Sequence, residues 1–510
     1  MTRYYLDILA ETIRNNWNQP ALTDFYLTED GSAQDTSRGK AYTYGEMYAE
    51  IYRVADLLTR LGLQPSDHIA ICGANSAHWV IAYLAIAKMQ GVSVTIMHSL
   101  QPDEIARLVD FSDAKALFVD ADIWEELNEE SLPQIQCVIA LEDWTILKGE
   151  KISLPIREKS EIGFPQSEPN SLAMICFTSG TTSRPKGVML SYSRISNLTN
   201  LEYIPIHYDT RNTIILFLPL AHDFGLEIGC LLPLTNNTHI YIFRDYLVNF
   251  RMYNAIEIIQ PKVLTIIPQM LSSLYATKGL TFYEALEKND VQVAMSGAKI
   301  DAKLETQCCN YAFPLSIVYG GTEMGFVSIS PYKQHKIGSC GKIIKNVSIA
   351  LENGEILVKG ENVMLGYYND TEATAQKIDT DGWLHTGDKG HLDADGYLYV
   401  EGRLEQDIIV LPNGEKIRPD NIERLIDAMP EVKESIVIAR EGKLIAIVVP
   451  TDKEISNIQS PMSNGAALCF NILHQINPLL PLYSQLDKVE LSDSPLARTE
   501  KQTLKRYLYK

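Results

Sequence analysis

The sequence predicts an α/β fold: a large N-terminal domain of α/β subdomains plus a small β subdomain, followed by a small mobile α+β C-terminal domain. Three observations lead to this prediction. Strand-like and helical segments alternate up to residue 330, and short strands with Gly turns follow up to residue 402. The polar stretch RLEQD then precedes a last piece with strands and helices of its own. We therefore expect one domain at residues 1–402 and another at 403–510.

The first strands and helices set the α/β pattern. Residues 68–72 (HIAIC), 92–96 (VSVTI) and 116–120 (ALFVD) are apolar and contain β-branched side chains. Helical segments at 76–90 and 101–112 separate them. Apolar strands joined by helices are typical of a parallel sheet that is covered on both faces. We expect parallel strands here.

The same alternation recurs further along the chain and then stops. Residues 261–267 and 291–297 are typical of strands, and the residues between them include a helical stretch, 272–288. Between residues 335 and 402, turns such as Asn353-Gly354 join short strands, which is typical of hairpins. This part is predicted to be an all-β subdomain.

The piece beyond residue 402 has the elements of a small α+β domain. A strand-like IIVL at 408–411 precedes a helical segment at 417–429. Two apolar strands at 435–440 and 443–450 and a helix-like tail follow. These segments are sufficient to form a separate hydrophobic core.

The composition is that of an ordinary globular protein, since 46% of the 510 residues are hydrophobic and 21% are charged. Forty-five Lys and Arg against 64 Asp and Glu give a formal net charge of −19. Such a field repels nucleic acid and offers an anionic membrane no attraction. We expect no nucleic-acid partner, and any anionic ligand has to be held by a local pocket.

The cysteines and the apolar segments indicate the compartment. The eight cysteines include no C-x-x-C pair, which argues against a zinc cage and a disulfide-dense secreted scaffold. The N-terminus is charged and lacks the apolar core of a signal peptide. The longest apolar run, 79–87, is shorter than the roughly 18–20 residues that span a bilayer, so we expect a buried helix there. The prediction is a cytoplasmic protein with reduced thiols and no transmembrane segment.

Residues 177–188, FTSGTTSRPKGV, have the composition of a phosphate-binding loop. They follow the strand-like LAMIC and combine five hydroxyl side chains, two glycines and two cations. Small residues let backbone N–H groups turn toward a phosphate, hydroxyls donate further hydrogen bonds and a lysine neutralises charge. The loop is not a Walker A motif, because Pro185 stands where that spacing requires glycine.

The loop resembles that of the acyl-adenylate-forming (AMP-binding) superfamily, T-S-G-T-T-G-x-P-K-G, and only Ser183 departs from it. The chain is most similar to medium- and long-chain fatty acyl-CoA synthetases, which have a version of LPLAH at residues 218–222. Further matches follow in the family's order at residues 296–298 (SGA), 319–323 (YGGTE), 354–356 (GEI), 366–367 (GY), 382–388 (GWLHTGD), 402–403 (GR) and 414–417 (GEKI).

This resemblance implies a reaction that joins a carboxylate to the α-phosphate of ATP, releases pyrophosphate and then transfers the acyl group to a thiol. Two anions have to approach each other, so cations, hydrogen-bond donors and Mg²⁺ are required. The catalytic residues that it implies are Lys186 at the phosphates, His222 beside the acyl carboxylate and Glu323 as the Mg²⁺ ligand. Glu323 offers a hard oxygen suited to a hard ion.

The resemblance also assigns the nucleotide site. Small residues and one aromatic ring would form the adenine wall, and Asp388 would accept both ribose hydroxyls. The implied nucleotide-binding residues are Thr178, Ser179, Gly180, Thr181, Thr182, Lys186, Gly297, Ala298, Lys299, Tyr319, Gly320, Thr322, Asp388, Arg403 and Lys416. Glu405 occupies the position of the family's hinge, about which the small domain rotates between the two half-reactions. The loop at 412–416 would approach the thiol donor.

The tail departs from the family's last motif, L-P-R-T-x-x-G-K-x-x-R. Alignment on Arg498-Thr499 and Arg506 places Thr503 where the family has a lysine that bridges carboxylate and phosphate. Threonine cannot supply that charge, and removal of such a contact commonly costs a few kcal/mol of transition-state stabilisation. Lys501 and Lys505 flank the position, and either one could act as the substitute.

Two functional hypotheses follow. The first is an ATP-dependent acid–thiol ligase, fatty acyl-CoA synthetase-like, with ATP, Mg²⁺ and coenzyme A or a carrier-protein phosphopantetheine as cofactors. Its partners would be a small-molecule carboxylic acid, most simply a fatty acid, and in one variant an acyl carrier protein; aryl acids use the same scaffold. The alternative is a catalytically weak adenylate- or acyl-binding homologue that lacks the usual C-terminal lysine.

Overall fold

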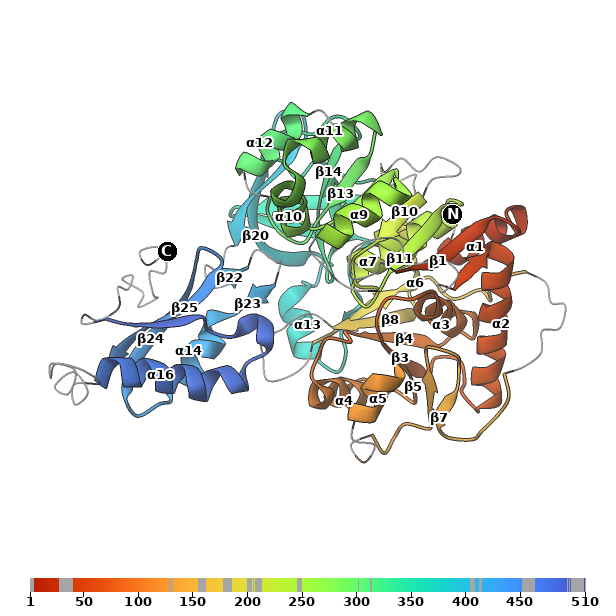
Figure 1. The fold of residues 1–510 in the computed structure, drawn as a ribbon, viewed down its shortest axis with the longest axis horizontal. Coiled ribbons are helices and arrows are strands. Elements are labelled where there is room, and N and C mark those ends of the chain that lie inside the picture. The colour runs from red at the N-terminus through yellow and green to blue at the C-terminus, as the bar shows by residue number, and fades with distance from the viewer. Residues whose placement is uncertain are drawn as a thin grey trace. The chain divides into compact units, whose positions relative to one another are not determined.

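The computed structural model separates the described residues into two compact units, one that ends at Gly402 and one that begins at Arg403. Figure 1 shows the ribbon of the chain coloured along the sequence. The structure describes residues 4–26, 40–127, 130, 132–154, 162–177, 186–199, 204, 206, 213–244, 250–300, 302–311, 314–403, 409–411, 415–451, 464–492, 494, 496 and 509.

The first unit contains two mixed sheets, which among the described residues have nine and eight strands. In spatial order the first sheet consists of β16 (Lys342–Ile343), β15 (Gly325–Ile329), β14 (Leu315–Gly321), β13 (Gln292–Met295), β12 (Val263–Ile266), β10 (Thr213–Leu216), β11 (His239–Phe243), β1 (Pro20–Phe25) and β2 (Ala41–Thr43). The second consists of β19 (Gly366–Tyr367), β9 (Gly187–Ser191), β8 (Leu172–Phe177), β4 (Val92–Ile96), β3 (His68–Cys72), β5 (Ala116–Val119), β6 (Cys137–Ala140) and β7 (Ile146–Lys148).

Both sheets are parallel at their centres and antiparallel at their edges. Strands β1, β11, β10, β12, β13 and β14 pair in parallel, as do β8, β4, β3, β5 and β6. The predicted parallel strands at 68–72, 92–96 and 116–120 are confirmed as β3, β4 and β5. Parallel strands bring their carboxyl ends to one edge of the sheet, which is where ligands bind in open α/β folds.

Helices cover the faces of the two sheets (Figure 1). Side chains of β3 alternate between two cores: Ile69 and Ile71 pack with α1–α3, and Ala70 and Cys72 pack with α4. One face of the nine-stranded sheet packs against α9–α12. The helices are α1 (Tyr5–Asn15), α2 (Tyr44–Arg60), α3 (Ala77–Lys88), α4 (Pro102–Phe111), α5 (Ala121–Glu126), α6 (Tyr192–Leu198), α7 (Asp223–Leu226), a π-helix (Glu227–Leu231), α8 (Leu232–Thr235), α9 (Phe250–Ile259), α10 (Pro268–Lys278), α11 (Leu280–Lys288), α12 (Ala302–Asn310) and α13 (Thr371–Lys377).

Helix α3 confirms the expectation for the longest apolar run. Ser76 caps it by accepting a hydrogen bond from the Trp79 N–H, and its residues from Ala77 to Ala87 are all buried. Among the described residues, no helix combines the length and the apolar character that crossing a bilayer requires. All eight cysteines are free thiols, as expected.

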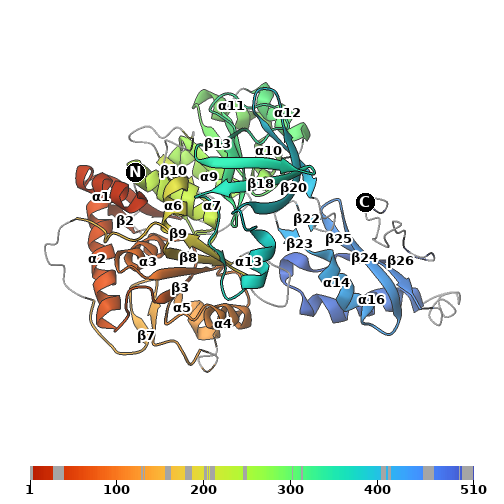
Figure 2. The same cartoon turned by 180° about the vertical axis from the view of Figure 1, so that it is seen from behind.

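Two local expectations differ from the structure. The helical stretch predicted at 272–288 is split into α10 and α11, because Gly279 takes φ +60° between them. The segment 335–402 does contain the small β subdomain, a sheet of β17 (Val347–Glu352), β18 (Glu355–Gly360), β20 (Leu384–Leu392) and β21 (Leu398–Arg403) (Figure 2). It is not all-β, since α13 lies within it and β19 joins the eight-stranded sheet.

The second unit has its own apolar core, formed by one face of a three-stranded sheet and two helices. Its elements are β22 (Ile409–Val410), β23 (Lys416–Ile417), α14 (Pro419–Asp427), β24 (Val432–Arg440), β25 (Lys443–Pro450), α16 (Asn464–Ile476) and β26 (Lys488–Leu491). Pro419 at the first position of α14 supplies the fixed φ that starts a helix. These elements include the predicted helix and the two predicted strands.

Candidate active site

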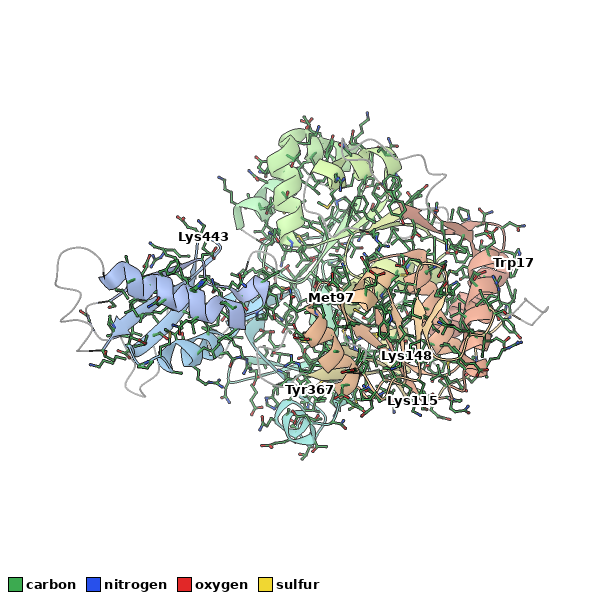
Figure 3. All side chains as sticks on the ribbon, turned by 60° about the horizontal axis from the view of Figure 1, so that its bottom comes forward. Trp17, Met97, Lys115, Lys148, Tyr367 and Lys443 are labelled. Carbon is green, nitrogen blue, oxygen red and sulfur yellow. The ribbon has the colours of Figure 1, made fainter. Side chains whose placement is uncertain are left out.

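Tyr367 connects two of the three predicted catalytic residues. The ammonium group of Lys186 lies 5.0 Å from the centre of the Tyr367 ring, and the Tyr367 hydroxyl donates a 3.1 Å hydrogen bond to Glu323 Oε1. A cation over an aromatic face is held electrostatically while its N–H groups stay available to other ligands. The structure thus brings Lys186 to the ring and Glu323 to the hydroxyl of the same residue, Tyr367, which is labelled in Figure 3.

The pairing of β9 with β19 explains this arrangement. The antiparallel register sets Tyr367 opposite Val188, two residues after Lys186, and the Tyr368 N–H donates to the Gly187 carbonyl at 2.7 Å. Tyr367 is buried. A short edge strand, rather than a flexible loop, therefore positions the phenol.

Glu323 lies in the turn between β14 and β15, and the segment that leads to β19 holds this turn. The Met364 N–H donates to the Glu323 carbonyl at 2.8 Å, and Asn362 Nδ2 donates to the Met324 carbonyl at 2.6 Å. The turn needs glycine at position 325, where φ is +61° and an added Cβ would lie 2.6 Å from the Asn362 carbonyl oxygen. The carboxylate of Glu323 is consequently fixed from both its backbone and its side chain.

The chemistry around Glu323 fits a Mg²⁺ ion held jointly by protein and nucleotide. Mg²⁺ is usually bound by one or two carboxylates together with substrate phosphates and water. Glu323 is half-buried, and among the described residues it belongs to no cluster of three or more acidic, His or Cys ligands. Glu323 would thus be the protein ligand, and the remaining oxygens would come from phosphate and water.

Several of the predicted nucleotide-binding residues lie near the carboxyl ends of β13 and β14. These two strands are parallel neighbours, with Met295 opposite Ile317, so Gly297–Lys299, just after β13, and Tyr319, near the end of β14, lie at the same edge of the sheet. Gly297 takes φ +93°, a conformation that favours glycine. The Tyr319 hydroxyl donates a 2.7 Å hydrogen bond to Asp388 Oδ2.

Asp388 is held within a tight turn on β20. The Asp388 N–H donates to Thr386 Oγ1 at 2.9 Å, and the Thr386 hydroxyl donates to the Ile356 carbonyl at 2.6 Å. The Gly387 N–H donates to Glu355 Oε1 at 2.8 Å, and Gly387 takes φ +74°. The T-G-D motif is therefore a scaffold that presents one nearly buried carboxylate.

Gly320 and Thr322 act through the backbone of the β14–β15 hairpin. A Cβ at Gly320 would lie 2.4 Å from the Gly325 carbonyl oxygen, so the two strands can approach only with glycine there. Thr322 is buried, and its carbonyl accepts a 3.1 Å hydrogen bond from Arg194 Nη2. Neither role requires a side chain to touch the nucleotide.

His222 caps the N-terminus of α7. Its side chain is 58% exposed, and Nδ1 lies 2.8 Å from Asp223 Oδ1. Asp223 is buried, and although burial alone would raise its pKa, His222 and Arg194 lower the pKa of this carboxyl well below its usual value. The imidazole is thus held by a buried carboxylate while its outer edge faces solvent.

The other predicted residues are distributed as follows. Lys416 lies in the second unit on β23, opposite Val410 of β22. Arg403 is the last residue of β21. Thr178, Ser179, Gly180, Thr181 and Thr182, the hinge residue Glu405, and Lys501, Thr503 and Lys505 lie outside the described residues.

Sequence reasoning did not assign roles to Tyr367, Arg194 and Glu355. Tyr367 belongs to a motif that was recognised, but only the fold shows that its hydroxyl meets Glu323. A sequence signal for Arg194 existed in its partners, since Asp223 and Glu227 are four residues apart and hence share a helix face.

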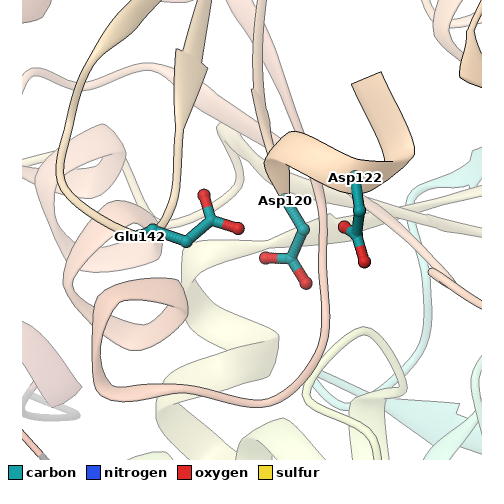
Figure 4. A group of neighbouring side chains, drawn as sticks. All are labelled: Asp120, Asp122 and Glu142. Atoms are coloured by element: carbon teal, nitrogen blue, oxygen red, sulfur yellow. The ribbon is translucent and has the colours of Figure 1, made fainter. Parts of the chain in front are cut away.

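A separate acidic group, Asp120, Asp122 and Glu142, was not expected (Figure 4). Asp120 Oδ2 accepts hydrogen bonds from the Ala74 N–H at 2.9 Å and from Arg244 at 3.0 Å. Glu142 accepts the Ala121 N–H at 3.0 Å. These carboxylates accept hydrogen bonds from backbone N–H groups and from an arginine, and these contacts are sufficient to explain them as structural.

Comparison with known proteins identifies the family. The AMP-binding enzyme family matches residues 9–368, and the AMP-binding enzyme C-terminal domain matches residues 406–509. The chain belongs to the AMP-binding enzyme family and is an acyl-adenylate-forming ligase. The predicted family is confirmed, whereas a particular similarity to fatty acyl-CoA synthetases stays a prediction.

Individual relatives agree with this placement. The chain is 27% identical over 471 residues to 4-coumarate--CoA ligase 4 of Arabidopsis thaliana, which covers 84% of this chain and 81% of the relative. Among solved structures it resembles o-succinylbenzoate CoA synthetase of Bacillus subtilis, with TM-score 0.75, 24% identity and coverage of 99% and 98%. It also resembles the amide bond synthetase McbA of Marinactinospora thermotolerans, with TM-score 0.78, 21% identity and 99% coverage of each chain. These structures share the fold.

Proposed function

We propose that the protein activates a carboxylic acid with ATP and then forms its coenzyme A thioester. In the first step a carboxylate oxygen attacks the α-phosphorus, the bond to the β-phosphate breaks and pyrophosphate leaves. In the second step the thiol sulfur attacks the acyl carbon, its proton is released and AMP leaves. The observation that carries this proposal is the group Lys186, Tyr367 and Glu323, which sets a cation and a metal-ligating carboxylate around one phenol.

Each residue of the group has a defined task in the proposal. Lys186 binds the departing phosphates as a point charge, which is needed because the chain carries a formal net charge of −19. Glu323 would hold Mg²⁺, which screens the two approaching anions when it is bound. Asp388 binds the ribose, and Tyr319, which donates to Asp388, lies with Gly297–Lys299 beside the base. Arg403 and Lys416 are further proposed nucleotide-binding residues, and we place the C-terminal domain at residues 403–510.

For the acid we propose a fatty acyl chain beside His222. Supporting this, Phe224 lies two residues after His222, is buried, and meets Phe326 of β15 edge to face, with ring centroids 5.8 Å apart, so the sequence next to His222 carries a large apolar side chain. An aryl acid is the second candidate, because relatives that cover 84% and 89% of this chain are 4-coumarate--CoA ligases.

Coenzyme A is the proposed thiol, because these relatives are named as CoA ligases. A carrier-protein phosphopantetheine is the alternative acceptor. The proposed location is the cytoplasm. The eight free cysteines support it, since such thiols stay reduced there.

A weak adenylate-binding homologue is the competing function, and Thr503 favours it because the family's bridging lysine is absent there. Pyrophosphate release with Mg²⁺·ATP and a panel of fatty and aryl acids separates the two. A ligase turns over at least one acid and forms its thioester when coenzyme A is added. Tight ATP binding without turnover on any acid would support the binding homologue instead.

A further inference from the structure

A fully buried arginine lies beneath the site. Arg194 of α6 has 0% exposed surface, and its guanidinium contacts three elements. Nη1 donates to Glu227 Oε1 of the π-helix, and Nη2 is 3.3 Å from Asp223 Oδ2 of α7. Nη2 also donates to the Thr322 carbonyl at 3.1 Å. The planar fork of an arginine suits such simultaneous contacts in a way that a lysine does not.

These contacts connect both ends of the proposed reaction. Toward the acid, the other Asp223 oxygen lies 2.8 Å from His222 Nδ1 and accepts the Phe224 N–H at 2.8 Å. Toward the metal, the Thr322 carbonyl belongs to the residue directly before Glu323. One guanidinium is therefore two contacts away from the imidazole and one peptide away from the metal-ligating residue.

The charges are not arranged for maximal stability. Two buried carboxylates share one arginine, and within the described part of the chain neither Glu227 Oε2 nor Arg194 Nε has a hydrogen-bond partner. Burial raises the pKa of Glu227 to about 7 despite the arginine beside it. Buried ion networks are often no more stable than apolar side chains of the same volume, so stability alone does not explain this one.

The backbone at this point is also unusual. Glu227 begins a single π-helical turn between α7 and α8, and such turns occur frequently at functional sites. An added Cβ at Gly225 would lie 2.2 Å from the Pro219 carbonyl oxygen, so α7 packs directly on the backbone of the LPLAH segment. Helix α7, which carries Asp223 and leads directly into the turn with Glu227, is thus tightly held.

We propose that Arg194 is a positioning residue that, through Asp223, orients His222 and, through the Thr322 carbonyl, fixes the turn that carries Glu323. The proposal rests on the proposed function for the role of those two residues. In this role Arg194 aligns the acid with the metal and the phosphates, and it does not contact the substrate.

The test uses the full-length protein and two variants. Arg194→Lys keeps the charge and loses the fork. Arg194→Met/Glu227→Gln removes the cation together with the charge of one partner, and leaves Asp223 with His222 and the Phe224 N–H, so that the core can still fold. Lys88→Met is the matched control, since it also removes a cation that donates to a backbone carbonyl, that of Gly163 at 2.8 Å. Thermal unfolding and circular dichroism establish which variants are folded.

Two measurements are made on the folded variants. In acid-dependent pyrophosphate exchange, we expect kcat to fall about 100-fold in the double variant and about 10-fold in Arg194→Lys, the size of effect that a misplaced group produces. In calorimetry without acid, we expect Mg²⁺·ATP to bind about 10-fold more weakly to the double variant, while ATP in EDTA binds unchanged. Lys88→Met should match the wild type in both.

The metal-specific loss distinguishes positioning from general loosening, which would weaken both forms of ATP alike. If the wild type turns over no acid, the proposed function fails, and the binding experiment alone still decides the role of Arg194. A folded double variant that binds Mg²⁺·ATP as the wild type does would overturn the proposal, as would one that loses ATP affinity equally with and without Mg²⁺.

Discussion

Tyr319 and Asp388, 69 residues apart in sequence, are joined by a 2.7 Å hydrogen bond from the phenol to a carboxylate oxygen. Tyr319 comes from the nine-stranded sheet of the first unit, and Asp388 from the four-stranded sheet. This bond fixes one carboxylate oxygen of Asp388. The turn that contains Asp388 orients the rest of the side chain. This pair is the proposed contact with adenine and ribose.

Asp388→Asn should weaken ATP binding about 10- to 100-fold, because it removes a charge-assisted acceptor of the ribose hydroxyls. Calorimetry with ATP and with 2′,3′-dideoxy-ATP measures the effect. The wild type should prefer ATP, and the variant should bind the two nucleotides almost equally. If the preference for ATP survives the substitution, the ribose does not contact Asp388.

Tyr319→Phe should weaken ATP binding only about 3- to 10-fold, since one neutral donor is lost.

The contributions of the Tyr367 hydroxyl and of the Tyr367 ring can be measured separately. Tyr367→Phe removes the donor to Glu323 and keeps the ring beside Lys186, so the Mg²⁺ concentration for half-maximal activity should rise about 3- to 10-fold with a small change in kcat. Tyr367→Leu removes both interactions and should also raise the KM for ATP. Steady-state kinetics over a Mg²⁺ titration provides the measurement. Equal effects of the two substitutions would show that the hydroxyl alone matters.

Gly225→Ala should destabilise the first unit by about 2 kcal/mol or more, since its Cβ would lie 2.2 Å from a backbone carbonyl oxygen. The matched control is Gly163→Ala, where an added Cβ meets nothing within 4 Å. Chemical denaturation of both variants gives the free energies of unfolding. Equal stability of the two variants would mean that α7 shifts freely relative to Pro219.

Glu227 should give the protein a pH-dependent stability. Burial raises the pKa of Glu227 from 4.5 to about 7 in the native state, despite the cation of Arg194, and Asp223 adds to the rise. Between these values the native state binds more protons than the unfolded state, so the stabilisation from this group is present below pH 4.5 and is lost as the pH rises through 7.

Comparison with Glu227→Gln isolates this contribution. The free energy of unfolding of the wild type should fall, relative to the variant, by on the order of a few kcal/mol between pH 5 and 8. Denaturant titrations across this range provide the measurement. Parallel pH profiles of the two proteins would show that Glu227 is ionised throughout. Arg194, Asp223 and His222, together with Tyr5 and Tyr83, interact electrostatically with this group and stay in place in the variant.

The departure at position 503 predicts a gain of function. Thr503→Lys should raise the rate of adenylation about 10-fold or more by restoring a charge-assisted contact, with little change in the thiolation of supplied acyl-AMP. If Lys501 already substitutes, Lys501→Ala should lower adenylation and spare thiolation. The two half-reactions are measured separately, by pyrophosphate exchange and by thioester formation from acyl-AMP. Unchanged rates in Lys501→Ala leave Lys505 as the candidate.

The sequence predicted much of the fold because the relevant information is local. The strands at 68–72 and 92–96 were predicted at their observed bounds, since apolar β-branched runs flanked by helical periodicity are visible within a few residues. The break at Gly279 and the helix α13 were missed. Helix α13 is a short element whose start depends on one Asp370 cap, and short elements carry little periodic signal.

For the site, the sequence by itself predicted which residues carry the chemistry: Lys186, His222, Glu323 and Asp388 are recognisable within their motifs. Only the tertiary structure decided how they are held. The Tyr367 hydroxyl reaches Glu323 across 44 residues, and Arg194 reaches Asp223 and Thr322 across 29 and 128 residues. Contacts of this kind depend on which strands pair and which faces pack, and sheet pairing and burial are properties of the folded chain rather than of any short segment.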